Sequence, residues 1–264
     1  MTKPLALGAL RIVDVMLHKE SSVPALRKEL GEKGWEALVG RLGEEPVEYL
    51  GSGFVGSAFL LESGKVLKFT NKAELHSADI LMNDYSGVHP EDAEGFPPRR
   101  EPHPNVIQIH DAFALLQNET EERIFGVGVV VKDAVDEVLD SVADPELFRA
   151  AERLVGNWEA PDIAPRRPYY LRPVPEAIEA DCWDLEQWVE RSAKLRLSPV
   201  EKALRNDLAA GIEHLLDLDL CPGDLLTMSN IGIKDGRAVF FDIMNSSAPV
   251  LTEEDIPVVW GPKR

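Results

Sequence analysis

Three glycines in the first quarter of the chain have the spacing of a phosphate-binding segment. Gly51, Gly53 and Gly56 form the pattern Gly-x-Gly-x-x-Gly. In a dinucleotide-binding fold this pattern joins a strand to a helix, where the pyrophosphate meets the helix N-terminus. Here β-rich sequence lies on both sides, which argues against that fold. The glycines instead predict a hairpin whose backbone N–H groups approach phosphate oxygens. Phe54 at its tip would shield the site from water, and Ser52 would bond a phosphate or cap the turn.

A single lysine follows the glycines inside an apolar strand. Lys68 lies twelve residues after Gly56, within the run Val-Leu-Lys-Phe. Successive side chains of a strand point to opposite faces, so Lys68 lies on the face opposite its apolar neighbours. An inward-pointing ammonium group needs an anionic partner, because burying an unpaired charge is costly. Phosphate and a helix carboxylate would supply this partner, and the candidate carboxylates are Glu74 and Asp79.

Two oxygen-bearing side chains near the end of the chain are expected to converge. The run Ile-Gly-Ile, a turn at Asp235-Gly236 and the run Ala-Val-Phe-Phe-Asp-Ile predict a β-hairpin. Asn230 would then lie just before its first strand and Asp242 at the end of its second. The sequence therefore predicts that the two side chains approach one spot.

The elements that position these groups follow from glycine and hydrophobic spacing. Residues 46 to 70 predict a three-stranded meander, Asn71 begins a helical pattern, and the runs VIQIHDAFALL and RIFGVGVVV predict two more strands. At the N-terminus, Ser22 caps a helix that Gly31 ends, and a second short helix ends at Gly43. Ser198-Pro-Val-Glu201 is a capping box that begins the clearest helix of the chain, which extends to about Leu218.

The composition limits the possible classes of protein. The chain has 264 residues, of which 44% are hydrophobic and 28% charged, which fits a soluble globular protein. No apolar run reaches the ~18 to 20 residues that span a bilayer, so we expect no membrane association. The net charge of −18 repels phosphate backbones, which disfavours nucleic acid as a partner. Acidic residues gathered between 133 and 162 are a solvated face or a docking surface for a basic protein.

The two cysteines, Cys182 and Cys221, are too few for a disulfide framework or a four-thiolate zinc site. A reducing cytoplasm is therefore the predicted location. The six histidines show no spacing typical of zinc sites.

Taken in order, these segments resemble the protein-kinase-like superfamily, in a compact form found among its bacterial and phage members. LGSGFVGSAFLLESGKVLKFT is similar to its glycine loop and lysine strand, and HPNVIQIHDAF to the strand after its regulatory helix. GDLLTMSNIGI and VFFDIM resemble its catalytic loop and metal-binding strand end. The similarity covers roughly residues 46 to 245.

The resemblance implies a role for each late polar residue and implies ATP and Mg²⁺ as cofactors. Asp224 would orient the acceptor hydroxyl and take its proton. Asn230 and Asp242 would hold Mg²⁺, Asp242 against the β- and γ-phosphates, since Mg²⁺ prefers oxygen ligands and substrate phosphates. The chemistry is mostly positioning and charge neutralisation, so few protein groups are needed.

Several positions depart from the family pattern. Pro222 and Gly223 precede the aspartate where the family has histidine and arginine or glycine. Asn230 follows the aspartate by six residues rather than the usual five, which leaves Asp219 as a fallback base. The sequence continues for 22 residues after Asp242, from which we expect a shortened helical lobe.

We expect an α+β, bilobal protein-kinase-like fold with a five-stranded antiparallel N-lobe and a shortened, mainly helical C-lobe. The predicted division is a helical extension over 1–45, an N-lobe over 46–132 and a C-lobe over 133–264, with nucleotide between the lobes. The expected function is an ATP- and Mg²⁺-dependent phosphotransferase, foremost an atypical Ser/Thr-type protein kinase. The alternatives are a small-molecule kinase of the aminoglycoside or choline type, whose catalytic loop is similar to Gly223-Asp-Leu, and a nucleotide-binding pseudokinase.

Overall fold

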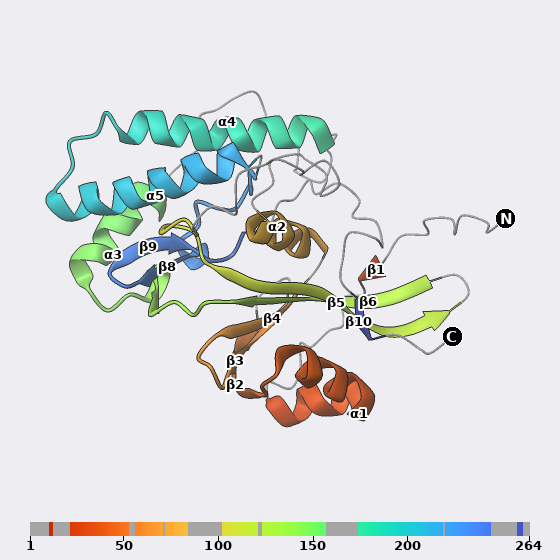
Figure 1. Cartoon of the computed structure of the whole chain (residues 1–264). Coiled ribbons are helices and arrows are strands. Elements are labelled where there is room, and N and C mark those ends of the chain that lie inside the picture. Colours follow the sequence, from red (N-terminus) through yellow and green to blue (C-terminus); the bar gives the residue numbers. More distant parts are fainter. Residues whose placement is uncertain are drawn as a thin grey trace. The chain divides into compact units, whose positions relative to one another are not determined.

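The computed structural model describes residues 11–12, 22–52, 56–70, 72–83, 102–120, 123–156, 174–218, 220–243 and 258–260. The described α-helices are α1 (Val23–Leu42), α2 (Lys72–Asn83), α3 (Pro145–Ala151), α4 (Val174–Ser192) and α5 (Pro199–Asp217). The shorter helices are the 3₁₀ helices η2 (Leu139–Ser141) and η5 (Met228–Asn230) and the π-helix η3 (Glu152–Gly156). The strands are β1 (Arg11–Ile12), β2 (Pro46–Ser52), β3 (Ser57–Leu61), β4 (Val66–Thr70), β5 (Ile109–Thr120), β6 (Arg123–Lys132), β7 (Glu137–Val138), β8 (Ile231–Lys234), β9 (Arg237–Phe240) and β10 (Val258–Trp260). Figure 1 shows these elements along the chain.

The chain forms two compact units. The first consists of residues 1–75, 109–133 and 250–264, and the second of residues 76–108 and 134–249. The sequence predicted a separate extension over 1–45, an N-lobe over 46–132 and a C-lobe over 133–264. In the structure, the N-terminal helical segment and β10 belong to the same unit as the sheet, and residues 76–108 belong to the second unit.

The first unit is built on a sheet whose five antiparallel strands follow the order β5-β6-β4-β3-β2. β2, β3 and β4 form the predicted meander. The strand that pairs with β4 is β6, and β5 lies on the other side of β6. The predicted α+β class and five-stranded antiparallel arrangement are therefore confirmed. Two short strands that the sequence did not predict extend the sheet in parallel, β1 beside β6 and β10 beside β5.

Helix α1 covers one face of this sheet. The Ser22 side chain accepts a hydrogen bond from the Ala25 N–H at 3.3 Å, as predicted for its N-cap. Gly31 has a φ of 68° and divides α1 into two helical segments, and Gly43 ends it at a φ of 73°. Both predicted glycine boundaries are thus confirmed. The helix and sheet share an apolar core made of Leu26, Leu30, Trp35, Leu38, Phe59, Leu61, Leu67, Phe69, Phe113, Leu115, Val129 and Val131.

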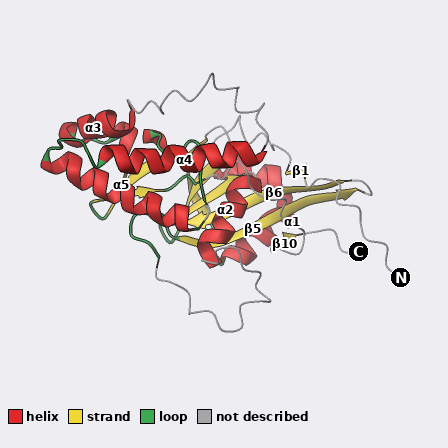
Figure 2. Ribbon diagram, turned by 90° about the horizontal axis from the view of Figure 1, so that it is seen from above, coloured by secondary structure: helices red, strands yellow, loops and turns green. Residues whose placement is uncertain are grey.

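The second unit is mainly helical and carries a small three-stranded sheet in the order β7-β8-β9. Helices α4 and α5 lie side by side (Figures 1 and 2). Trp188 of α4 is fully buried, and its indole N–H donates to the Leu154 carbonyl at 2.8 Å. Leu204, Leu208 and Ile212 of α5 pack in the same core. None of the described helices is long and apolar enough to cross a membrane.

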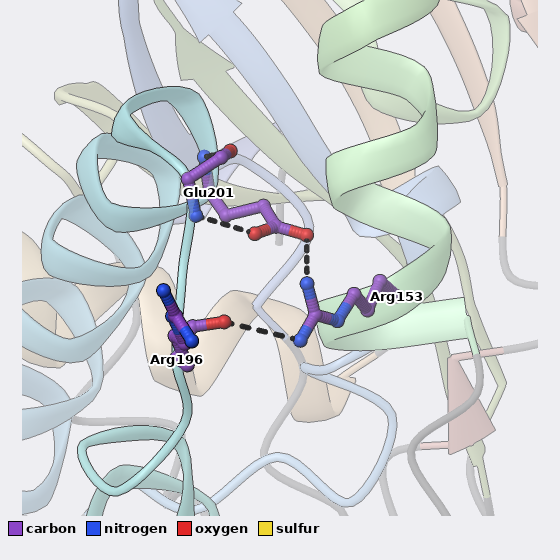
Figure 3. Close-up of polar contacts among 4 residues, drawn as sticks. Arg153, Arg196 and Glu201 are labelled. Atoms are coloured by element: carbon purple, nitrogen blue, oxygen red, sulfur yellow. Dashed lines mark hydrogen bonds and ion pairs between the residues drawn. The ribbon is translucent and has the colours of Figure 1, made fainter.

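The start of α5 is fixed by several polar contacts. The predicted capping box is present: the Glu201 N–H donates to the Ser198 hydroxyl, and the Ser198 N–H donates to the Glu201 carboxylate at 2.7 Å. Arg153 of η3 donates to the same carboxylate at 2.6 Å and to the Arg196 carbonyl at 3.2 Å (Figure 3). These contacts join η3 to the beginning of α5.

The two cysteines form a single disulfide, which the sequence analysis did not predict. Cys182 of α4 is bonded to Cys221, which lies just before the Pro222-Gly223-Asp224 turn, and their Cα atoms are 5.0 Å apart. The sequence could not show this pair because 39 positions separate the two residues. The small number of cysteines therefore no longer supports a reducing cytoplasm as the location.

Candidate functional site

The glycine segment joins β2 to β3, two strands of the meander, as predicted. Gly51 has a φ of 153°, which favours glycine, and Gly51 and Ser52 pair with Ala58 and Ser57 across the hairpin. Ser52 is exposed. Gly53 and Phe54 lie outside the described residues, so the position of the hairpin tip stays a prediction.

Gly56 lies directly against the backbone of the lysine strand. A Cβ atom at this position would be 1.8 Å from the carbonyl oxygen of Phe69, a distance that no side chain tolerates. The last glycine of the motif is therefore required by the close approach of the hairpin to β4. Since Phe69 follows Lys68, this approach brings the glycine segment next to the lysine.

Lys68 has a buried carboxylate partner, as predicted for an ammonium group that points inward. Its side chain lies on the face of β4 opposite Leu67 and Phe69, and its Nζ is 2.8 Å from Oε2 of Glu74. Lys68 is only 8% exposed and Glu74 only 3%. The Thr70 hydroxyl donates to the same carboxylate oxygen. Of the two carboxylates left open by the sequence, the structure thus pairs Glu74 with Lys68.

A second buried lysine, which the sequence analysis missed, reaches the same carboxylate. Nζ of Lys132, the last residue of β6, is 3.4 Å from Oε1 of Glu74. Lys132 ends an apolar run, and its approach to Glu74 depends on how β6 pairs with β4. No spacing in the sequence gives that register, so Lys132 could not have been singled out beforehand.

The late polar residues belong to a loop and hairpin of the second unit. The Asn230 side-chain N–H donates to the Asp224 carbonyl at 2.9 Å. The backbone N–H of Phe241 donates to the backbone carbonyl of Asn230 at 3.1 Å, which ties the end of β9 to the same loop. Asp242 follows directly. The structure therefore brings Asp224 and Asn230 together and anchors the residue before Asp242 to them.

The six-residue spacing between Asp224 and Asn230 is accommodated by a turn followed by η5. The Leu225 N–H donates to the Pro222 carbonyl at 3.2 Å, and the Asn230 N–H donates to the Thr227 carbonyl at 2.9 Å. The extra residue noted in the sequence thus lies in a hydrogen-bonded loop. The alternative base, Asp219, lies outside the described residues.

Buried polar contacts hold the strand that leads to Asp242. The Asn105 side chain is 4% exposed and donates to the Ala238 carbonyl at 2.9 Å. The backbone carbonyl of Asn105 accepts from the Phe240 N–H at 3.0 Å, and the backbone N–H of Ile107 donates to the Phe240 carbonyl at 2.9 Å. Asn105 is thus a second supporting residue that the sequence analysis did not identify.

The donor set of this loop fits a hard cation. The Asn230 amide nitrogen is directed to the Asp224 carbonyl, which leaves the amide oxygen as the atom able to bind a metal. Asp224 is exposed and Asp242 half-buried, so both carboxylates are reachable. Oxygen ligands of this kind suit Mg²⁺ combined with substrate phosphates. Among the described residues, no three His, Cys, Asp or Glu side chains form a cluster that would hold a metal by themselves.

Comparisons with known proteins add little to this geometry. No protein-family model matches the chain, and no curated protein matches it. Solved structures do match, 24 chains in all. One is a thermostable mutant of the aminoglycoside phosphotransferase APH(4)-Ia in its apo form, 12% identical, covering 80% of this chain and 70% of that chain, with a TM-score of 0.33. This similarity is too low to indicate a function for this chain.

Proposed function

We propose that the protein is an ATP- and Mg²⁺-dependent phosphotransferase that acts on a hydroxyl group. The observation that carries this proposal is the buried Lys68–Glu74 ion pair, on the strand against which Gly56 packs. A protein has little reason to bury an ammonium group beside a glycine hairpin for stability alone, because the desolvation cost offsets the attraction. A phosphate-binding role explains both the lysine and the glycine.

Each unit supplies one part of the chemistry. In the first unit, Lys68 neutralises phosphate charge, and Glu74 holds the ammonium group in place. In the second unit, the Asp224 carboxylate orients the acceptor hydroxyl and takes its proton as the γ-phosphoryl group moves to the hydroxyl oxygen and ADP leaves. Asn230 and Asp242 would hold Mg²⁺, which supplies neutralisation of the phosphate charge.

The acceptor we favour is a hydroxyl of a protein, as in an atypical Ser/Thr-type kinase. The net charge of −18 favours a basic protein over an acidic one as the partner. A small-molecule acceptor is the alternative, because Gly223-Asp-Leu resembles the catalytic loop of aminoglycoside and choline kinases. The cytoplasm stays the proposed location, since ATP is supplied there.

Incubation with γ-labelled ATP, Mg²⁺ and a cell lysate tests the proposal and separates the acceptors. Label on protein supports the protein kinase, and label on a small molecule supports the alternative.

Lys68→Met should abolish transfer without loss of the fold, and Asp242→Asn should weaken Mg²⁺-dependent nucleotide binding in a calorimetric titration. Binding of ATP without any transfer would instead indicate a pseudokinase, and turnover unchanged by Lys68→Met would remove the kinase assignment.

A further inference from the structure

The Glu74 carboxylate is shared between two buried lysines, although only one lysine is needed for a phosphate-binding ion pair. Oε2 of Glu74 contacts Lys68 Nζ at 2.8 Å, and Oε1 contacts Lys132 Nζ at 3.4 Å. Lys132 is 4% exposed, which makes it more buried than Lys68. A lysine this buried is uncommon and needs an explanation beyond an ordinary surface ion pair.

The strand register explains why both lysines reach one carboxylate. On β4 and β6, Lys68 lies opposite Val130, and Val66 lies opposite Lys132. Residues directly opposite each other in an antiparallel pair share a face, and so do residues two apart on one strand. The two lysines therefore lie on one face as diagonal neighbours, a position at which Cα atoms are ~7 to 8 Å apart. Glu74 of α2 extends its two oxygens to the two ammonium groups.

This arrangement fixes the direction of the Glu74 carboxylate. A glutamate has three rotatable side-chain bonds, and one ion pair leaves much of that freedom. Contacts on both oxygens, with the Thr70 hydroxyl on Oε2, restrict the carboxylate to one orientation. When a phosphate attracts the Lys68 ammonium group, Lys132 still compensates the carboxylate, which would otherwise be a poorly paired buried charge.

We propose that Lys132 is a positioning residue of the nucleotide site: it holds Oε1 of Glu74 so that Oε2 is presented to Lys68. This inference rests on the proposed function, because it assumes that Lys68 contacts the phosphates of ATP. Lys132 acts through Glu74 and Lys68 and makes no contact of its own with the nucleotide.

The test is a double-mutant cycle with Mg²⁺-ATP as the ligand, measured by calorimetric binding and by turnover. Lys132→Met should lower kcat/KM by about tenfold or more, because a displaced lysine binds the phosphates in the wrong place. Lys132→Arg, which keeps a cation at this position, should recover most of that loss. In a Lys68→Met background, Lys132→Met should weaken ATP binding no further, since the group through which it acts is gone.

Three results would overturn the positioning role. These are equal kcat/KM for Lys132→Met and the wild type, no recovery with Lys132→Arg, and a Lys68→Met/Lys132→Met protein that binds ATP more weakly than Lys68→Met alone. The last result would mean that Lys132 contacts the nucleotide directly.

Lys65→Met, outside the cluster, is the matched control, and circular dichroism identifies the folded fraction so that a stability loss is not mistaken for lost affinity. If the wild type neither binds nor turns over ATP, the proposed function fails. If the wild type is active and Lys132→Met has the same kcat/KM, this inference alone fails.

Discussion

The two units of the molecule hold their candidate site residues in opposite ways. In the first unit, Lys68, Glu74 and Lys132 are buried among strands and helix α2, each less than a tenth exposed. In the second unit, Asp224 is exposed on a loop, and Asn230 and Asp242 are half-buried at the end of a hairpin. A substitution at the site residues of the first unit should therefore change stability as well as function. In the second unit the site residues lie on an accessible loop, which other residues hold in place.

The largest expected effect comes from removing the buried carboxylate. Glu74→Gln leaves two buried ammonium groups without this charge partner, which we expect to cost about 3–5 kcal/mol in the free energy of unfolding. Asp224→Asn should change it by no more than about 0.5 kcal/mol, because the carboxylate is exposed and the carbonyl that binds Asn230 is retained. Both variants should lose phosphotransfer. Urea unfolding curves of the two proteins measure the difference.

Equal stability losses for the two variants would contradict the contrast between the units. A Glu74→Gln protein as stable as the wild type would show that neighbouring groups compensate the two lysines without the glutamate. Leu67→Ala is the matched control, since Leu67 precedes Lys68 but lies in the apolar core. It should cost about 2–5 kcal/mol while the folded fraction keeps its activity.

The next effect concerns the scaffold of the second unit. The Cys182–Cys221 disulfide closes a long loop and anchors the chain three residues before Asp224. Cys182→Ser should lower stability by about 2–4 kcal/mol through the greater freedom of the unfolded chain. Thermal unfolding with and without dithiothreitol measures this loss.

In the wild type the reductant should reproduce the effect of the substitution, whereas in Cys182→Ser it should have no further effect. A melting temperature of the wild type that is insensitive to dithiothreitol, under conditions where thiol titration shows both cysteines reduced, would mean that the cross-link does not stabilise this unit.

The difference between the units also explains what the sequence could predict. Gly31, Gly43 and the Ser198 capping box act over a few residues, and the structure confirms each of these boundaries. Lys68 was predictable because strand alternation fixes the face of the lysine, and the next helix narrowed its partner to Glu74 or Asp79 without deciding between them. Lys132, Asn105 and the disulfide depend on pairing between distant segments, as do the parallel strands β1 and β10. Register and long-range contacts of this kind are set by packing of the whole unit, and local spacing does not encode them.

The smallest expected effect is a pH dependence at the start of α5, which supports the second unit away from the candidate site. The hydrogen bond from the Ser198 backbone N–H lowers the pKa of Glu201 below its ordinary value of 4.5, and the Arg153 side chain adds to this. A carboxylate whose pKa is lower in the folded state stabilises the fold above the unfolded-state pKa and stops doing so as the pH falls through the folded-state pKa. Glu201→Gln should therefore lower the melting temperature at pH 7 and make no difference at a pH below both values.

Ser198→Ala provides the comparison, because it removes the hydroxyl that accepts the Glu201 N–H and leaves the carboxylate in place. It should cost about 1 kcal/mol at pH 7, the usual effect of losing an N-cap, and a cost should persist in acid because no proton is involved. Melting curves of the three proteins from pH 7 to pH 3 distinguish the two contributions. If the difference between Glu201→Gln and the wild type stays constant over this range, the ionised carboxylate is not what joins η3 to α5. The neutral capping box would then account for the whole contact.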